Sequence, residues 1–442
     1  MFSAKDLRKL IIPLVIEQLL AISLGIFDTV MVSSVGETAV SGVSLVDMLN
    51  VLVIDLFAGI ATGGAVVASQ YLGAGKNDRA SKSGSQLVVM SAFFGILFAV
   101  IVVMFRRPIM ELLFGSVEKD VMDSALVYLK ITAMSFPFIS VYNAAAALFR
   151  SMGNSRISMV SSLVINAVNI GGNAILIYVF HMGVAGAAIS TVFSRFIAMV
   201  YLLWRLTRDG QEIVLRAGDM SPELPMMKKI LWIGIPSGFE NSMFQLGRVL
   251  VVTLIATFGT AQIAANAVAN NLDSFGCIPG KGLQIAAITV VGQCIGAGLE
   301  DQAVEYSKKL MKLAYILTIG INLLVQATLP LSLMLYNISD EAKSLSVILV
   351  LIHTGFSLFL WPMAFVMPSC LRAGGDVKYP LFVSIFSMWV FRILFSYIIG
   401  MGFGLGAIGV WIAMIMDWIF RAVMYMTRFR SRKWLHESVA KN

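Results

Sequence analysis

The stretch SLGIFDTVMVS, residues 23–33, places one carboxylate, Asp28, among apolar residues. An ionisable side chain inside a membrane span costs about 2.5–3.5 kcal/mol on insertion scales, so a functional role is the default expectation. Burial disfavours the ionised form of a carboxylate and a bound cation favours it, so such a group can exchange a proton for a metal ion. Asp28 is therefore the first candidate for cation coupling. The structural alternative is a neutral acid that is hydrogen-bonded to a neighbouring helix.

Three more acids lie inside apolar runs. Asp55 is central in NVLVIDLFAGIATGG, where a functional role and structural pairing are evenly balanced. Glu17 and Glu240 each follow a proline by one turn, at Pro13 and Pro236. Because a proline leaves a helix carbonyl without its usual partner, these two acids could stabilise helix packing near a hinge or contact a substrate.

Charges in the second half of the chain suggest a ladder between two neighbouring spans. At 1.5 Å per residue, Glu240 and Lys281 lie about 15 and 17 Å from one membrane surface, and Arg248 and Asp273 about 27 and 28 Å. Charges paired inside a helix bundle are less costly than isolated ones. We therefore expect the pairs Glu240–Lys281 and Arg248–Asp273, as structural or cavity-lining groups, with separate access to water as the alternative. Asp417, four residues before an arginine, is expected to form an intrahelical pair with Arg421.

The spans that must hold these residues follow from composition. The chain has 442 residues, of which 58% are hydrophobic and 13% charged, where a soluble domain has about 25% charged residues. Its mean hydropathy is +0.85. Apolar stretches of about 20 residues recur from end to end, each long enough to cross a bilayer core of about 30 Å. Since the alternation typical of a membrane β-barrel is absent, we predict an all-α integral membrane protein.

Neither the basic residues nor the cysteines and histidines indicate another class of protein. The net charge is +8, but the basic residues gather in short connectors, as in cytoplasmic loops, so nucleic acid is not an expected partner. The cysteines and histidines show no metal-type spacing; they are Cys277, Cys294, Cys370, His181, His353 and His436.

We count twelve spans. They start near Leu10, Val46, Leu87, Ser124, Ile157, Val184, Ile230, Ile263, Leu310, Leu345, Pro380 and Ala407. An even number places both termini on one side, and the loops of the other side hold as basic residues only Arg106, Arg107, Lys119 and Lys343. The positive-inside rule then predicts that both termini are cytoplasmic. The location we expect is a plasma (inner) membrane. A polar connector divides the chain into an N-terminal bundle (1–205), a cytoplasmic linker (206–229) and a C-terminal bundle with a basic tail (230–442).

The two halves repeat in sequence. IPLVIEQ begins at Ile12 and IPSGFEN at Ile235, and SQYLGAGKNDRA matches GQCIGAGLEDQA, both 223 residues apart. GVAG and GAIG keep the same offset, and LFRSMGN matches CLRAGGD at 222. Because six spans per half is an even number, the repeat is parallel, with a pseudo-two-fold axis along the membrane normal. This is a layout of transporters. LGAGKND lacks the pattern of a nucleotide-binding loop and is expected to be a turn.

IPLVIEQLLAISLGIFDTVMVSSVG, VASQYLGAG, LFRSMGNSR and GVAGAAIST resemble the MATE (multidrug and toxic compound extrusion) transporters of the bacterial NorM/DinF kind. The resemblance covers nearly the whole chain. It implies two six-helix bundles and export of amphipathic, often cationic compounds, driven by entry of Na⁺ or H⁺. No organic cofactor is implied.

The resemblance also assigns residues. Asp28 occupies the position of the family's cation-coupling Asp and is the candidate Na⁺ ligand. Partner groups come from the fifth and sixth spans, where NAVNIGGN supplies Asn169 and Asn173, and AIST supplies Ser190 and Thr191. Some members have a second Asp at Asn173, so its absence leaves Na⁺ and H⁺ coupling both open. Some also have acids in spans seven and ten, where this chain has Phe244 and Trp361, so a second ion site of that type is not expected.

The function we predict is secondary antiport of organic compounds by alternating access. The alternative is a flippase for lipid-linked oligosaccharide or lipid of the same superfamily, which usually has extra spans and a strongly basic cavity. A membrane enzyme would need a catalytic set such as His-Glu-x-x-His, which the sequence lacks. The expected partners are a small organic substrate and the lipid bilayer, and the expected state is a monomer.

Overall fold

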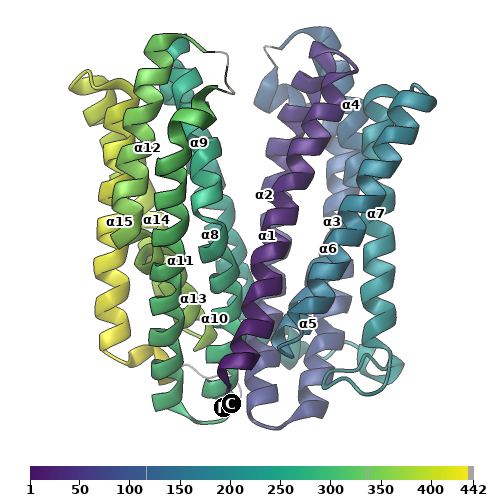
Figure 1. The fold of residues 1–442 in the computed structure, drawn as a ribbon. Coiled ribbons are helices and arrows are strands. Elements are labelled where there is room, and N and C mark those ends of the chain that lie inside the picture. The colour runs from purple at the N-terminus through teal and green to yellow at the C-terminus, as the bar shows by residue number, and fades with distance from the viewer. Residues whose placement is uncertain (116, 335, 337, 437–442) are drawn as a thin grey trace. The chain divides into compact units, whose positions relative to one another are not determined.

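The structure is a computed structural model that describes residues 1–115, 117–334, 336 and 338–436. All regular elements in these ranges are helical (Figure 1). The chain divides into two compact units, one formed by Phe2–Asn241 and the other by Ser242–Asn442 together with Met1.

The first unit holds seven α-helices and the start of an eighth. They are α1 (Ala4–Ser33), α2 (Glu37–Gly73), α3 (Asn77–Phe114), α4 (Lys119–Ala133), α5 (Phe136–Ser151), α6 (Ser155–Asn173) with its π-helical extension η1 (Ala174–Val179), α7 (Gly183–Leu206), the short η2 (Ala217–Met220) and α8 (Leu224–Ala256). Helices α2 and α3 both pack on α5, and α6 packs between α1 and α7. This places Asp28, Asn169 and Thr191 on three neighbouring helices.

The second unit continues from α8. It holds α9 (Thr260–Gly276), α10 (Ile278–Gly296), α11 (Glu300–Met334), α12 (Asp340–Trp361), η3 (Pro362–Val366), α13 (Met367–Ala373), α14 (Lys378–Ser387), η4 (Met388–Leu394), η5 (Ser396–Gly402), α15 (Gly406–Arg430) and η6 (Lys433–His436). Helix α12 packs against α9, α11 and α15. Its side chains therefore face those of α9 and α15 inside this unit.

Ten of these helical segments are long and apolar enough to cross a membrane, and α4 with α5, bent by 48° at their junction, gives an eleventh. The 33-residue α8 lies where the remaining expected span begins. Helix α3 has an exposed apolar face. Its residues Phe93, Ile96, Val100 and Met104 are 49–68% exposed and recur at helical spacing, which forms the apolar stripe expected to face lipid.

The repeat is also present in the backbone. Gly75 and Gly298, which end the matching LGAG and IGAG turns, have φ angles of +69° and +74°. Gly183 and Gly406, which open α7 and α15, have φ angles of +55° and +56°. Glycine adopts this region at no steric cost, so the repeated glycines set the same chain reversals in both halves. LGAGKND accordingly forms a turn between α2 and α3.

Helices α2 and α8 approach each other closely within the first unit. A Cβ atom built on Gly59 would overlap the backbone of Gly238, and one on Gly63 would overlap Ile230 and Gly234. The glycines are four residues apart on each helix, the small-xxx-small pattern that lets membrane helices touch through their backbones. The start of α8 is therefore fixed on α2 by backbone contact.

The connector before α8 lies on α3. Gln86 Nε2 donates hydrogen bonds to the carbonyl oxygens of Asp219 and Ser221, both at 2.8 Å. Lys82 Nζ lies 2.9 Å from Glu223 Oε2, and Arg79 Nη1 lies 3.3 Å from Glu223 Oε1. The hydrogen bond from Lys82 and the nearby positive charges lower the pKa of the Glu223 carboxyl.

Candidate functional site

Asp28 and the two asparagines of α6 come together in the first unit. Asn173 Nδ2 donates to Asp28 Oδ1 at 2.6 Å and to Asn169 Oδ1 at 3.2 Å. Asn169 and Asn173 are 1% and 0% exposed, whereas Asp28 is half-buried. One amide therefore joins the carboxylate of α1 to the polar face of α6.

The α7 residues support this arrangement from behind. Asn169 Nδ2 donates to Thr191 Oγ1 at 3.2 Å, and Ser190 Oγ donates to the Asn169 carbonyl oxygen at 2.7 Å. Of the four expected neutral partners, Asn173 contacts Asp28 directly. Asn169 is linked to Asp28 through Asn173, and Thr191 is linked to it through Asn169 and Asn173. Ser190 binds the backbone of α6.

The local backbone explains how the helices come so close. A Cβ atom on Gly172 would overlap the Ser190 hydroxyl, so the glycine lets α7 approach α6 at this level. Beyond Asn173 the chain continues as the π-helix η1. Short π-helical segments inside α-helices are frequent at functional sites, because they rotate the following residues and disturb the regular hydrogen bonding.

The residues fit a small hard cation. Asn173 Oδ1 is buried and accepts no hydrogen bond from the described part of the chain. A buried acceptor without a donor costs free energy, and such an atom in a native structure calls for an explanation such as a water or an ion. Amide and carboxylate oxygens are the ligands that hard cations prefer. Asp28 and Asn173 could thus hold Na⁺, and Asp28 alone could carry a proton.

Three charged or phenolic side chains lie near this site that sequence patterns alone did not assign to it. Asp47 and Arg195 both act electrostatically on Asp28. Tyr128, 5% exposed, approaches Asp47, and Arg195 Nη1 donates to Ser135 Oγ at 2.7 Å. Arg195 lies four residues after Thr191, on the same face of α7, and that spacing could have identified it. The site therefore contains two carboxylates and one guanidinium.

Glu17 is a buried ion-pair partner. Its Oε1 lies 2.9 Å from Arg150 Nη1, and its Oε2 accepts a hydrogen bond from Ser158 at 2.8 Å. Glu17 is 7% exposed and connects α1 to α5 and α6. Of the two roles expected for Glu17, this geometry favours helix packing. Asp55 is half-buried on α2, and its two roles remain open.

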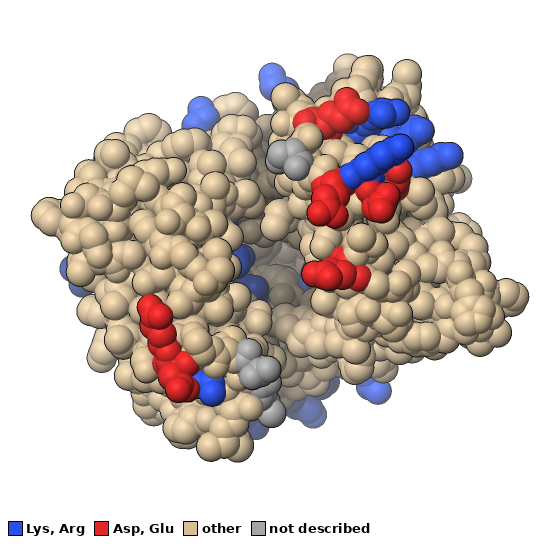
Figure 2. Space-filling view, turned by 90° about the horizontal axis from the view of Figure 1, so that it is seen from above, with Lys and Arg blue, Asp and Glu red and all other residues tan. Residues whose placement is uncertain are grey.

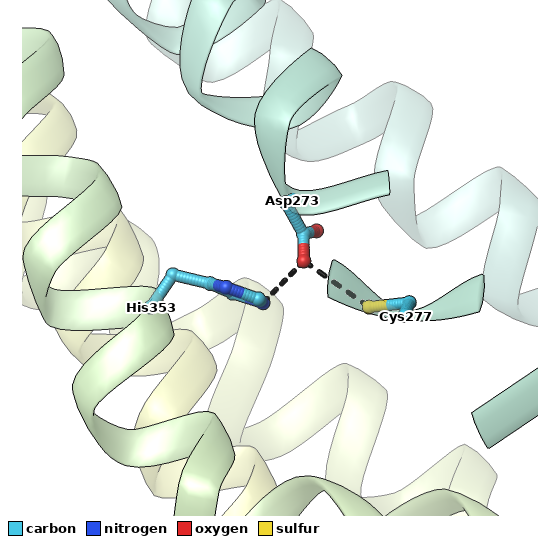
Figure 3. Close-up of side chains that lie close together, drawn as sticks. All are labelled: Asp273, Cys277 and His353. Atoms are coloured by element: carbon cyan, nitrogen blue, oxygen red, sulfur yellow. Dashed lines mark hydrogen bonds and ion pairs between the residues drawn. The ribbon is translucent and has the colours of Figure 1, made fainter. Parts of the chain in front are cut away.

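In the second unit Asp273 has a partner other than the expected one. His353 Nε2 lies 2.5 Å from Asp273 Oδ1, and Cys277 Sγ donates to the same oxygen at 3.2 Å (Figure 3). The expected partner Arg248 attracts Asp273 at longer range. His353 replaces it because α12 packs directly on α9, a contact between segments distant in sequence.

Asp273, Cys277 and His353 also offer metal-type ligand atoms within 4.8 Å of one another. The sequence showed no metal-type spacing because His353 comes from a different helix. In the structure the Cys277 thiol donates a hydrogen bond to one Asp273 carboxylate oxygen, and the His353 imidazole lies beside the same oxygen (Figure 3).

The remaining charges of the second half are placed as follows. Arg421 Nε lies 2.7 Å from Asp417 Oδ1, which confirms the expected intrahelical pair on α15. Lys281 is exposed on α10, one turn after Cys277. Glu240 is buried on α8 and belongs to the first unit, so its pairing with Lys281 stays a prediction.

Comparison with known proteins gives one consistent result. The family model described as MatE matches residues 13–179 and again residues 236–398. The two matches start 223 residues apart, the offset of the sequence repeat.

Two relatives match over most of their length. A Thermotoga maritima protein named "Probable multidrug resistance protein NorM" is 27% identical, covering 98% of this chain and 94% of that protein. The Bacillus subtilis protein named "Uncharacterized transporter YisQ" is 25% identical, with coverage of 97% and 94%.

Solved structures show the same fold. A MATE crystallised in complex with MaL6 has a TM-score of 0.90 at 21% identity and covers 97% of both chains. An outward-facing multidrug resistance MATE transporter of the MOP superfamily has a TM-score of 0.87 at 21% identity, with coverage of 97% of this chain and 96% of that one.

Proposed function

The chain belongs to the MatE family of transporters, and we propose that it exports amphipathic organic cations from a bacterial cell in exchange for Na⁺ or H⁺. It is a multi-pass membrane protein and not an enzyme, as the family consists of transporters. Support for drug export comes from the names of relatives such as the multidrug resistance protein NorM of T. maritima.

One observation carries the coupling proposal. The Asp28 carboxylate lies against the Asn173 amide, whose buried oxygen has no donor among the described residues. A cation bound by the carboxylate and by this amide oxygen would neutralise the carboxylate and give the amide oxygen a partner. The polar contacts of Asn169 and Thr191 hold the amide in place.

The charge on Asp28 is then conditional. In one state of the transport cycle the carboxylate is ionised and holds Na⁺ or is ready to accept a proton, and in the other it is protonated or has lost its ion. A cation shifts the equilibrium between two conformations only by its differential affinity for them. Entry of one positive charge down a potential of 100 mV supplies about 2.3 kcal/mol for this shift. Arg195 and Asp47 set the local field in which the exchange occurs.

The orientation that we propose places both termini in the cytoplasm and the protein in the plasma membrane, as a monomer. In the first unit, the end away from the start of α1 carries small groups of charged side chains on a largely uncharged surface (Figure 2). The loops at this end contain few basic residues, which supports an extracytoplasmic location under the positive-inside rule; they are Arg106, Arg107 and Lys119.

Transport in reconstituted vesicles tests the proposal. Na⁺ and pH gradients are imposed separately, and the movement of a fluorescent organic cation is followed. We expect wild-type protein to respond to one gradient or both, and Asp28→Asn to lose gradient-driven export while remaining folded. Asp78→Asn, a change at a fully exposed carboxylate in the first turn of α3, is the matched control and should export normally. Wild-type export by Asp28→Asn would contradict the proposal.

A further inference from the structure

A small cavity inside the second unit is lined by positive and neutral polar groups. It lies between the end of α8, α9, η4 and α15, and its polar wall consists of Arg248, Asn266, Asn270, Arg392 and Trp411. The rest of its wall is apolar, and no carboxylate of the described residues lines it.

Arg392 is poorly neutralised. Its side chain is 12% exposed, and its ion-pair contact is to Asp417 Oδ2 at 3.9 Å. Asp417 is bound much more closely by Arg421 at 2.7 Å and also accepts a hydrogen bond from Ser387. Arg392 Nε is buried and has no hydrogen-bond partner in the described part of the chain. A guanidinium in this position has donor capacity that the protein itself does not use.

Arg248 brings a second guanidinium to the same cavity. Its attraction to Asp273 is shared with His353, which lies 2.5 Å from that carboxylate. Three guanidinium groups, those of Arg248, Arg392 and Arg421, therefore lie near two carboxylates. Asp417 is paired with Arg421, and Asp273 lies beside His353. Arg392 and Arg421 have side chains that are 12% and 3% exposed, whereas Arg248 is exposed. Buried positive charge inside a membrane protein is costly, and a bound anion would offset it.

The two neutral amides of the wall differ: Asn270 Nδ2 donates to the Asn266 backbone carbonyl at 2.8 Å, whereas Asn266 keeps its NH₂ group. Trp411 Nε1 donates to Asn266 Oδ1 at 3.0 Å, so the remaining hydrogen-bonding capacity of that side chain is chiefly its NH₂ group. The Phe244 ring lies 5.8 Å from the Arg392 guanidinium carbon and 5.6 Å from that of Arg421. The ring lies beside both guanidinium groups but offers no negative charge to the cavity.

We propose that this cavity binds a carboxylate group of the exported compound, with Arg392 and Arg248 as its charged donors. The planar fork of a guanidinium matches a carboxylate in two parallel hydrogen bonds. The inference rests on the proposed export function and narrows its substrates to amphipathic cations that also carry a carboxylate. A free inorganic or organic anion shares this chemistry and is the other source of an occupant.

Two dyes that differ at one group test the proposal. Rhodamine B carries a fixed cation and a carboxylate, and its ethyl ester carries the same cation without the acid. Export of both from vesicles is compared for wild type, Arg392→Gln and Arg248→Gln, with Arg107→Gln, an exposed ion-pair residue of α3, as control. We expect Arg392→Gln to lower export of rhodamine B about tenfold or more and to leave export of the ester unchanged. An equal loss for both dyes, or no loss for either, would overturn the proposal.

Binding to purified full-length protein in detergent separates this inference from the transport function. Fluorescence anisotropy should show tighter binding of rhodamine B than of its ester, and Arg392→Gln should remove the difference while its thermal unfolding stays cooperative. If this binding difference is observed but wild-type protein exports neither dye, the carboxylate site is supported and the proposed export function is refuted. Equal binding of the two dyes, together with Arg392-dependent stabilisation by acetate or phosphate, would assign the cavity to a free anion and refute the substrate carboxylate.

Discussion

The ion pair between Glu17 and Arg150 allows a stability prediction that separates packing from coupling. Glu17→Gln removes the charge that faces Arg150 Nη1 at 2.9 Å and weakens the acceptor of the Ser158 hydroxyl. The side chains of Glu17 and Arg150 are 9% and 16% exposed, so the arginine charge would stay largely buried without its partner.

Breaking a buried pair by removing one partner costs about 3–5 kcal/mol, and the partial exposure of Arg150 favours the lower end. If the first unit unfolds cooperatively, a loss of about 3 kcal/mol lowers the midpoint of thermal unfolding by about 6–12 °C. The double change Glu17→Gln with Arg150→Gln should cost less than the sum of the two single changes, because the double variant has lost both charges of the pair.

The assay is thermal unfolding of purified protein in detergent, combined with gradient-driven export at a temperature where all variants are folded. We expect the midpoint to fall and the dependence of export on the ion gradient to remain. An unchanged midpoint together with lost coupling would show that Glu17 acts in transport, and the packing role argued from its contacts would be wrong.

Three further predictions follow from close contacts elsewhere. Gly59→Ala should lower the midpoint of thermal unfolding, because its Cβ would overlap the backbone of α8 and overpacking costs about 1–3 kcal/mol. Gly25→Ala, where nothing lies within 4 Å of the added Cβ, should not lower the midpoint. Equal midpoints for the two variants would refute the close crossing of α2 and α8. Asn169→Ala should reduce the ion dependence of export less than Asp28→Asn, since it contacts Asp28 only through Asn173; an equal loss would place Asn169 in the site itself. His353→Gln should lower the unfolding midpoint, because Asp273 loses its closest partner. His181→Gln, a change at an exposed loop residue, should leave the midpoint unchanged. Similar midpoints for both variants would count against the buried pair.

Local sequence patterns predicted the fold well because each pattern is confined to one helix or one turn. Apolar runs of bilayer length located the spans, and the offset of 223 residues between Pro13 and Pro236 reappears in the paired glycine turns and the two family matches. The i,i+4 spacing of Asp417 and Arg421 also fixed their contact, since both residues lie on one helix.

Contacts between helices were harder to predict, because depth along a helix axis does not specify which face points to which neighbour. Arg248 and Asp273 were matched by depth alone, but packing of α12 on α9 gives Asp273 to His353. Tyr128 and Arg195, which approach Asp47 of α2, likewise come from neighbouring helices. The direct contact of Asn173 with Asp28 agrees with the residues that the family resemblance assigned, whose coupling role remains a prediction.

The most direct test of the central claim reverses the direction of coupling. Vesicles containing the purified protein are prepared without any ion gradient, and a gradient of the organic cation is imposed while internal pH and internal Na⁺ are followed with fluorescent indicators. In wild-type vesicles we expect the substrate gradient to drive H⁺ or Na⁺ in the opposite direction, and in Asp28→Asn vesicles we expect no ion movement above that of protein-free vesicles. Ion movement at the wild-type rate in Asp28→Asn would contradict the assignment of Asp28 as the coupling group.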